Sequence, residues 1–320
     1  MRYYILFSLI TLATYAASSL VAALAVWVSS PFFRRHLASR PAAARARILA
    51  AARLLPVAAG AASALLVASV FYRYEPRDTA EVPGVLLMAF ALTTVALAGL
   101  AAGRVLKSWR ASATCAKLLR QCGDLWARND GQRIWVIDSA YPVAAVTGLF
   151  RTRLLISTRI VRECTPRELD AVIRHETAHV RRRDNLVRAA MTCLPDPLVL
   201  LPAGRELAAD WAAAAEEAAD NEAAGPRAEA RMELAAALVR VARMAEGPPP
   251  RWMPALAFYE GTNLENRVHR LLLDGPGVKA VSTVRIAAAG VFAAAATLLA
   301  ADGLSADLHN VMELAVRYLP

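Results

Sequence analysis

Long apolar runs dominate the first third of the chain. Tyr3 to Phe33, Leu54 to Tyr72 and Val82 to Gly103 contain no charged residue. Each has about the 20 residues that an α-helix needs to cross roughly 30 Å of hydrocarbon. A fourth run, Val281 to Ala301, carries Arg285 near its start, where a long side chain can extend to the membrane interface. The pattern predicts an integral membrane protein, mainly α, with about four transmembrane helices.

The first run has an alternative interpretation as a cleavable signal peptide. The apolar part of a signal peptide is roughly 7–15 residues long, about half the length of this run, so we expect a retained helix. For the other runs the alternative is buried core helices of a soluble protein. Three uncharged runs before residue 104 argue against it.

Basic residues predict how the chain crosses the membrane. The connection between the first two runs holds six arginines and no acid: Arg34, Arg35, Arg40, Arg45, Arg47 and Arg53. The connection between the second and third runs, and the tail after the fourth, are slightly acidic. Cytoplasmic loops carry the excess of Lys and Arg. We therefore expect a multi-pass protein of the inner (cytoplasmic) membrane with its N-terminus outside and residues 104–280 in the cytosol.

Charge and cysteine content narrow the class of protein further. The 320 residues are 57% hydrophobic and carry a net charge of +10. Arginines beside membrane spans meet anionic headgroups, so the lipid bilayer is an expected partner and direct binding to nucleic acid is not. A DNA-binding membrane regulator is a weaker alternative, without a helix-turn-helix or finger pattern. The four cysteines form no C-x-x-C pair, which indicates neither a disulfide framework nor a cysteine zinc site.

The predicted cytosolic region mixes helices and strands. Residues 104–130 have a helical pattern that ends at the turn signal Asn129-Asp130-Gly131. The segments RIWVID (133–138), VAAVTG (143–148) and RLLIST (153–158) have strand composition and predict a small meander or hairpin. We divide the chain into a membrane region (1–103), a cytosolic α+β domain (104–280), and a fourth transmembrane helix with a short extracytoplasmic tail (281–320).

A helix is predicted to begin near residue 165 in this domain. Thr165 can serve as its N-cap, Pro166 suits the first helical position, and Glu168 completes a capping box with Thr165. Leu169, Val172, Ile173 and Ala178 then recur at helical spacing and predict its buried face. The segment RHETAHVRRRDN (174–185) falls inside or at the end of this helix.

The candidate chemistry lies on this helix. Residues four apart on a helix share a face, so His175 and His179 present two imidazoles together, as a tetrahedral Zn²⁺ requires of its protein ligands. Glu176 is positioned to take a proton from a metal-bound water. Together they form the H-E-x-x-H pattern of zinc metallopeptidases. The alternative is a pair of surface histidines in a basic helix.

A zinc hydrolase needs a third protein ligand and one position left for water. Two acidic pairs follow in the segments RELAAD (205–210) and EEAAD (216–220). Their Glu-x-x-x-Asp spacing places both carboxylates on one helical face, where the Asp can orient a ligating histidine through its ring N–H. Spacing alone does not choose between Glu216 with Asp220 and Glu206 with Asp210.

Three segments carry a resemblance to a known family: AVIRHETAHVRRRDNLVR, DPLVLLP and EEAADNEAAGPRAEARMELAAALVRVAR. They resemble the membrane zinc metallopeptidases of family M56, typified by β-lactam-sensing antirepressors. The resemblance implies a zincin-like (gluzincin) fold for the cytosolic domain, and it favours Glu216 as the third zinc ligand with Asp220 behind it. It also makes the segment AAVTGLFRTRLLIST a hairpin whose edge strand would align a peptide substrate.

The chain departs from that family at several points. Thr177 stands where an apolar residue is usual, and Ala219 where cysteine is common. The chain contains no Ser-x-x-Lys, so we expect no β-lactam binding and no penicillin-binding sensor domain. The CAAX-processing and heat-shock membrane proteases of family M48 are a second resemblance, which HVRRRDN makes the weaker one.

The expected function is that of a membrane-embedded, zinc-dependent endopeptidase in a signalling pathway. Its substrate would be a cytosolic protein, such as a transcriptional repressor, or the chain itself. Glu176 would act as general base, and His269 is a possible oxyanion donor, although a lone histidine there is more often a surface residue. The alternatives are an M48-like protease of quality control or processing, and a non-proteolytic receptor with a structural zinc site. The sequence leaves open whether residues 191–204 pack in the core or enter the membrane.

Overall fold

Three long helices form the N-terminal part of the computed structural model, which describes residues 2–76, 82–127, 133–245 and 264–273. They are α1 (Arg2–Leu37), α2 (Ala42–Tyr74) and α3 (Val85–Cys122). Each has a stretch long and apolar enough to cross a membrane. The three runs predicted before residue 104 are confirmed as such helices. The predicted fourth run and the turn at residues 129–131 lie outside the described residues.

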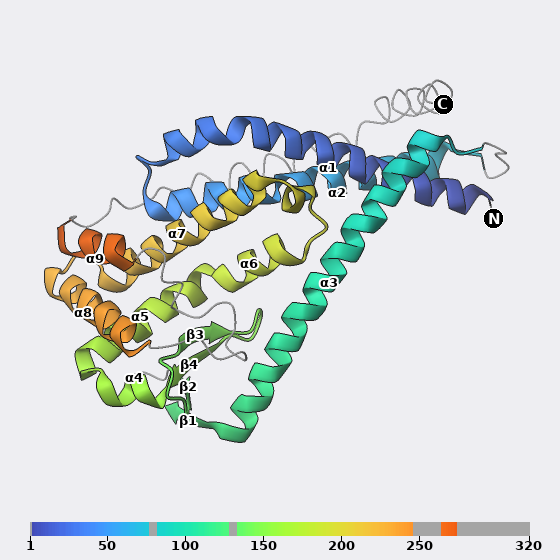
Figure 1. Cartoon of the computed structure of the whole chain (residues 1–320). Helices are drawn as coiled ribbons and strands as arrows, with labels where there is room; N and C mark the ends of the chain where they lie inside the picture. Colours follow the sequence, from blue (N-terminus) through green and yellow to red (C-terminus); the bar gives the residue numbers. More distant parts are fainter. Residues whose placement is uncertain (1, 77–81, 128–132, 246–263, 274–320) are drawn as a thin grey trace.

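Helices α1 and α2 lie side by side, and α3 descends obliquely from them toward the sheet (Figure 1). Helix α3 passes Gly103 without a break and ends at Cys122. The helical prediction for residues 104–130 is therefore correct up to Cys122 and wrong for Gly123–Ala127, which form strand β1. Glycine at 123 does not favour the helix, and pairing with the next strand supplies the hydrogen bonds that residues 123–127 would have made within it.

The small sheet contains β1 with β2 (Arg133–Ile137), β3 (Ala144–Thr147) and β4 (Arg153–Ser157), in the order β1-β2-β4-β3. Strands β3 and β4 form the predicted antiparallel hairpin. A meander is wrong, because β4 lies between β2 and β3 and pairs with β2 in parallel. This order makes β3 an edge strand.

Short helices follow the sheet and carry the predicted chemistry. After α4 (Thr158–Glu163) come α5 (Pro166–Arg182), α6 (Asp184–Cys193), the 3-10 helix η1 (Pro197–Leu200) and α7 (Pro202–Ala224). Helices α8 (Ala228–Met244) and α9 (Leu264–Leu273) complete the described chain. They pack against α5 and α7 at the end of the molecule far from α3 (Figure 1).

The start of α5 is the capping box that the sequence predicts. The Glu168 N–H donates to Thr165 Oγ1 (3.3 Å), and the Thr165 N–H donates to Glu168 Oε2 (2.8 Å). Burial alone would raise the pKa of Glu168, but the bond from the Thr165 backbone and the pairing with Arg240 on α8 hold it below its ordinary value. The helix start is therefore fixed by a charged group as well as by the backbone.

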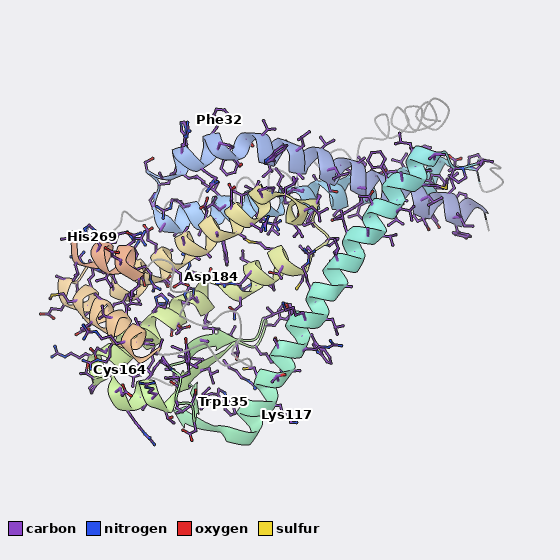
Figure 2. All side chains as sticks on the ribbon, viewed as in Figure 1. Phe32, Lys117, Trp135, Cys164, Asp184 and His269 are labelled. Atoms are coloured by element: carbon purple, nitrogen blue, oxygen red, sulfur yellow. The ribbon has the colours of Figure 1, made fainter. Side chains whose placement is uncertain are left out.

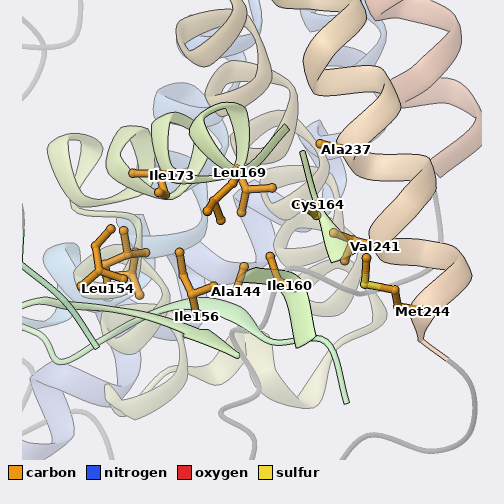
Figure 3. Close-up of a cluster of buried hydrophobic side chains, with 13 residues drawn as sticks. Ala144, Leu154, Ile156, Ile160, Cys164, Leu169, Ile173, Ala237, Val241 and Met244 are labelled. Carbon is orange, nitrogen blue, oxygen red and sulfur yellow. The ribbon is translucent and has the colours of Figure 1, made fainter. Parts of the chain in front are cut away.

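One hydrophobic core joins the sheet to α5 and α8 (Figure 3). Leu154 and Ile156 of β4 face Leu169 and Ile173 of α5, and Val241 of α8 closes the cluster. The four residues predicted as the buried face of α5 are all buried. This core fixes α5, and with it both histidines, relative to the edge strand β3.

A second core joins α7 to the membrane helices. Leu198 of η1 and Leu207 and Trp211 of α7 are buried against Val26 of α1 and Leu49 of α2. Residues 191–204 form the end of α6, the 3-10 helix and the start of α7, and Met191 and Leu198 among them are buried in this core, whereas Leu194 and Leu200 are exposed.

One polar side chain from each of the three membrane helices also binds the segment around η1, between α6 and α7. Tyr15 of α1 donates its hydroxyl to Pro195 O (2.5 Å), and Arg104 of α3 donates to Leu194 O (3.1 Å). Arg53 of α2 forms an ion pair with Asp196 and donates from Nε to Gly204 O (3.2 Å). The loop at the start of α7 is therefore held from three sides.

Candidate metal centre

Two histidines of α5 face a common point. Because they lie one helical turn apart, the Nε2 atoms of His175 and His179 come within 3.1 Å of each other, with their rings edge to face. His175 is fully buried and His179 nearly so. Their ring nitrogens thus converge in a site largely shielded from water.

Helix α7 crosses α5 and brings a carboxylate to the same point. Glu216 Oε2 lies 3.4 Å from His175 Nε2, and Glu216 Oε1 lies 3.5 Å from His179 Nε2. The three potential ligand atoms are all within 4.8 Å of one another. Glu206, the alternative third ligand, lies elsewhere: its side chain is 51% exposed and pairs with Arg34 of α1 (2.5 Å). Asp210 pairs with the same arginine.

Each histidine has a carboxylate behind it. His175 Nδ1 lies 3.0 Å from Oδ1 of Asp220, the residue predicted to orient a ligating histidine, and His179 Nδ1 lies 2.7 Å from Asp184 Oδ2. A carboxylate that accepts the Nδ1–H leaves the Nε2 lone pair for a metal ion. Both imidazoles therefore present Nε2 toward Glu216.

Sequence reasoning missed the role of Asp184. It lies beyond the end of α5, and it reaches His179 only because Arg183 adopts a left-handed conformation (φ 57) that turns the chain into α6. Non-glycine residues rarely adopt this conformation. Asp184 lies toward the middle of the molecule in Figure 2. The signal available was the Asp-Asn that ends the arginine run in the quoted motif.

A second residue that sequence reasoning missed is Arg267 of α9. Its Nε and Nη2 donate to the two oxygens of Asp220 (2.8 and 2.7 Å), and its Nη1 lies 3.1 Å from Glu216 Oε2. His269, two residues on, is exposed at the periphery of the molecule (Figure 2). Its exposure agrees with the surface residue that the sequence favours at this position, and α9 turns Arg267 inward.

The protonation states follow from this cluster of charges. Burial would raise the pKa of Glu216, but the hydrogen bond with His175 and the charge of Arg267 hold it far below its ordinary value. Burial would likewise raise the pKa of Asp220, which Arg267 and His175 lower. Burial lowers the pKa of His175, but Asp220 and Glu216 outweigh this effect and raise it to about 9. Both carboxylates are therefore ionised, and a metal ion at His175 would replace the proton on Nε2.

Glu176 differs from the other carboxylates. It is buried beside the two histidines on α5, and burial raises its pKa above the ordinary value despite the nearby positive charges. A carboxylate with a raised pKa holds a proton more readily than an ordinary one. The direction of this shift suits a general base.

The donor set fits zinc. Two imidazole nitrogens and one carboxylate oxygen are the protein ligands of one class of catalytic Zn²⁺ site, in which the fourth tetrahedral position remains for water or substrate. The hydrogen bonds of both Nδ1 atoms to carboxylates fit the same ion, because such bonds fix the ring orientation of metal-bound histidines.

The edge strand β3 lies beside the end of α5. Asn185 donates from Nδ2 to Val146 O (2.9 Å) and to Gly148 O (3.2 Å). Because Val143 O accepts from Ser157 of β4, alternation along an antiparallel pair turns the backbone groups of Ala144 and Val146 to the open edge. The residue after Asp184 thus fixes this edge relative to the metal ligands.

A family model described as BlaR1 peptidase M56 matches residues 2–271. None of the curated proteins compared with the chain matches significantly. The matched range begins in α1 and ends in α9, so it contains the membrane helices as well as every residue of the candidate metal centre.

Proposed function

The chain belongs to the M56 peptidase family, a family of membrane metallopeptidases, and on that premise we propose that it is a zinc-dependent endopeptidase. The observation that carries the proposal is the convergence of His175, His179 and Glu216 within 4.8 Å. Its support is the pair of carboxylates, Asp220 and Asp184, that orient the two imidazoles.

The chemistry divides between the ion and the protein. Bound zinc would supply Lewis acidity, polarising the scissile carbonyl and making a water molecule more acidic. Glu176 would accept the proton of the attacking water and return it to the leaving amine, a double role that its burial and raised pKa suit. Glu216 and the two histidines would hold the ion, and the two carboxylates behind the histidines would keep Nε2 directed at it.

The substrate we propose is an extended segment of a cytosolic protein, such as a transcriptional repressor, or of the chain itself. An extended peptide can add as a further strand to an open sheet edge, and β3 offers the outward backbone groups of Ala144 for such pairing. Asn185 would keep that edge in place during the reaction. The proposed cytosolic location is supported by the arginine-rich stretch between the first two apolar runs, which includes Arg40 in the α1–α2 connection and Arg45 and Arg47 in the first turns of α2.

The test compares the parent chain with Glu176→Gln, both purified in detergent with their metal content measured. We expect about one zinc per chain in both, and loss of proteolysis in the variant only. Proteolysis is read by comparing the new N-termini that appear in cells expressing each form. A folded parent without zinc would contradict the proposal. A cellular response that survives in zinc-loaded Glu176→Gln would instead favour the non-proteolytic receptor.

The ligand set is tested by a matched pair on α7. Glu216→Ala should remove the zinc, whereas Glu206→Ala should leave it in place because Glu206 contacts Arg34 and not the histidines. Loss of zinc from both variants would indicate a general effect on α7, and retention in Glu216→Ala would exclude Glu216 as the third ligand.

A further inference from the structure

A guanidinium group bridges the two acidic residues that α7 contributes to the site. We propose that Arg267 is a positioning residue of the metal centre, which holds Asp220 against His175 and Glu216 toward the ion. The donor set would then be complete only when α9 is docked. This inference rests on the proposed function, because it takes the ion to be the zinc of the peptidase.

All three nitrogens of the guanidinium are used. Nε and Nη2 form a fork on the two oxygens of Asp220 (2.8 and 2.7 Å), and Nη1 reaches Glu216 Oε2 (3.1 Å). A fork of this kind fixes the plane of a carboxylate as well as its position. Lysine, a single point charge, cannot reproduce that geometry. Arg267 therefore sets the orientation of Asp220, not only its charge.

The orientation of Asp220 reaches the metal ligand directly. Asp220 Oδ1 accepts from Arg267 Nη2 and lies 3.0 Å from His175 Nδ1, so one oxygen links the arginine to the imidazole. If the carboxylate rotated, the Nδ1–H of His175 would lose its acceptor, and Nε2 would no longer be held toward Glu216. Arg267 thus acts on His175 through Asp220.

The contact between Arg267 and Glu216 gives the two oxygens of Glu216 different neighbours. Oε2 faces Arg267, whereas Oε1 faces His179 Nε2 (3.5 Å). The arginine therefore presents Glu216 in one rotational state, with one oxygen held by the guanidinium. The guanidinium charge also balances two carboxylates four residues apart on the same helix, the buried Asp220 and the partly buried Glu216, because burying charge without a partner is costly.

The packing of α9 on α7 and α8 places the Arg267 side chain in the metal centre. Leu271 of α9 is buried in a cluster with Ala223 of α7 and Leu234 of α8. Arg267 precedes Leu271 by one helical turn and so lies on the same, inward face. Arg270 anchors the helix separately, in an ion pair with Glu217. A helix whose apolar face packs on α7 and α8 thereby carries one cation into the site.

Arg270 provides a matched control. It is three residues from Arg267, on the same helix, and pairs with α7, but its partner Glu217 is not one of the metal donors. The experiment uses the full-length chain in detergent and measures zinc affinity by competition with a chromogenic chelator. Arg267→Met should lower the affinity about 10–100-fold, the usual effect of losing a group that orients a ligand. The zinc affinity of Arg267→Lys should lie between those of the parent and Arg267→Met, and the affinity of Arg270→Met should equal that of the parent.

A double-variant comparison separates positioning from mere support of the fold. If Arg267 acts through Asp220, then Arg267→Met should cost much less zinc affinity when Asp220→Asn is already present. The visible spectrum of the cobalt-loaded protein gives a second readout, which Arg267→Lys should change and Arg270→Met should not. The spectrum of Arg267→Lys tests the inference even if Arg267→Met does not fold.

The outcomes separate this inference from the proposed function. Tight zinc binding by the parent together with unchanged affinity and cobalt spectra in the Arg267 variants would overturn the positioning role and leave the peptidase proposal standing. Equal losses with and without Asp220→Asn would overturn the role of Arg267 through Asp220 and leave only its contact with Glu216. A folded parent that binds no zinc would overturn both.

Discussion

The ion pair between Arg53 and Asp196 joins membrane helix α2 to the loop before α7, and Asp196→Ala should destabilise the chain severely. The two residues are only 3% and 1% exposed. The replacement leaves the arginine charge buried without its partner. It also removes the cap of η1, since Asp196 Oδ1 accepts the Leu198 N–H (2.8 Å).

The magnitude follows from these two losses. Removing one partner of a buried ion pair costs about 3–5 kcal/mol, and loss of a side-chain cap costs about 1 kcal/mol. We therefore expect the free energy of unfolding to fall by about 4–6 kcal/mol in Asp196→Ala. Asp196→Asn keeps an oxygen that can cap η1, so its free energy of unfolding should fall only by the cost of the broken ion pair, about 3–5 kcal/mol.

The assay is unfolding in mild detergent by titration with a denaturing detergent, followed by far-ultraviolet circular dichroism. Glu206→Ala is the matched control, because its ion pair with Arg34 is half exposed and should contribute less than about 1 kcal/mol. The double variant Arg53→Met with Asp196→Asn removes both charges and should recover most of the loss. Equal stability of Asp196→Ala and Glu206→Ala would refute the reasoning, since it would mean that the buried pair is energetically like a surface pair.

Three other perturbations address the site and its supports. Asp184→Asn should weaken zinc binding about 10–100-fold in chelator competition, because Asp184 orients His179; unchanged affinity would exclude that role. The pKa of Glu168 is lowered in the folded chain, so its capping box stabilises the protein above the ordinary pKa, and this contribution is lost as pH falls through the lowered one. The thermal midpoint of Glu168→Gln should therefore fall less steeply below about pH 5 than that of the parent, and parallel curves would contradict this. Gly204→Ala should unfold at a lower temperature, because its Cβ would lie 2.0 Å from Leu198 O, whereas Gly99→Ala, with open space around it, should not.

The sequence predicted best what neighbouring residues determine. The capping box of Thr165 and Glu168 fixes the start of α5, and helical spacing alone brings His175 and His179 together. The apolar face of α5 and the three membrane helices follow from periodicity and length in the same way. Each of these depends on interactions within a few turns of one element.

The third metal ligand, the strand order and the partner of Arg267 depend on packing between segments that are distant in the sequence. Glu206 and Glu216 have the same spacing to an aspartate, and only the crossing of α5 and α7 brings Glu216 to the histidines. The parallel pairing of β2 with β4 has no local signal either. Arg267 did leave a signal, since it occupies the apolar stripe that includes Leu264 and Leu271. An arginine on that stripe must have a buried partner, but periodicity does not identify the partner.

Leu207 and Trp211 of α7 are buried against α1 and α2, so the membrane helices cover one face of the helix that carries Glu216. A truncated chain that begins after Gly103 would leave this face bare and Asp196 without Arg53. Such a fragment would be expected to aggregate rather than to fold as a soluble enzyme. Assays, inhibitor screens and crystallisation therefore all require the intact chain in detergent, nanodiscs or lipid.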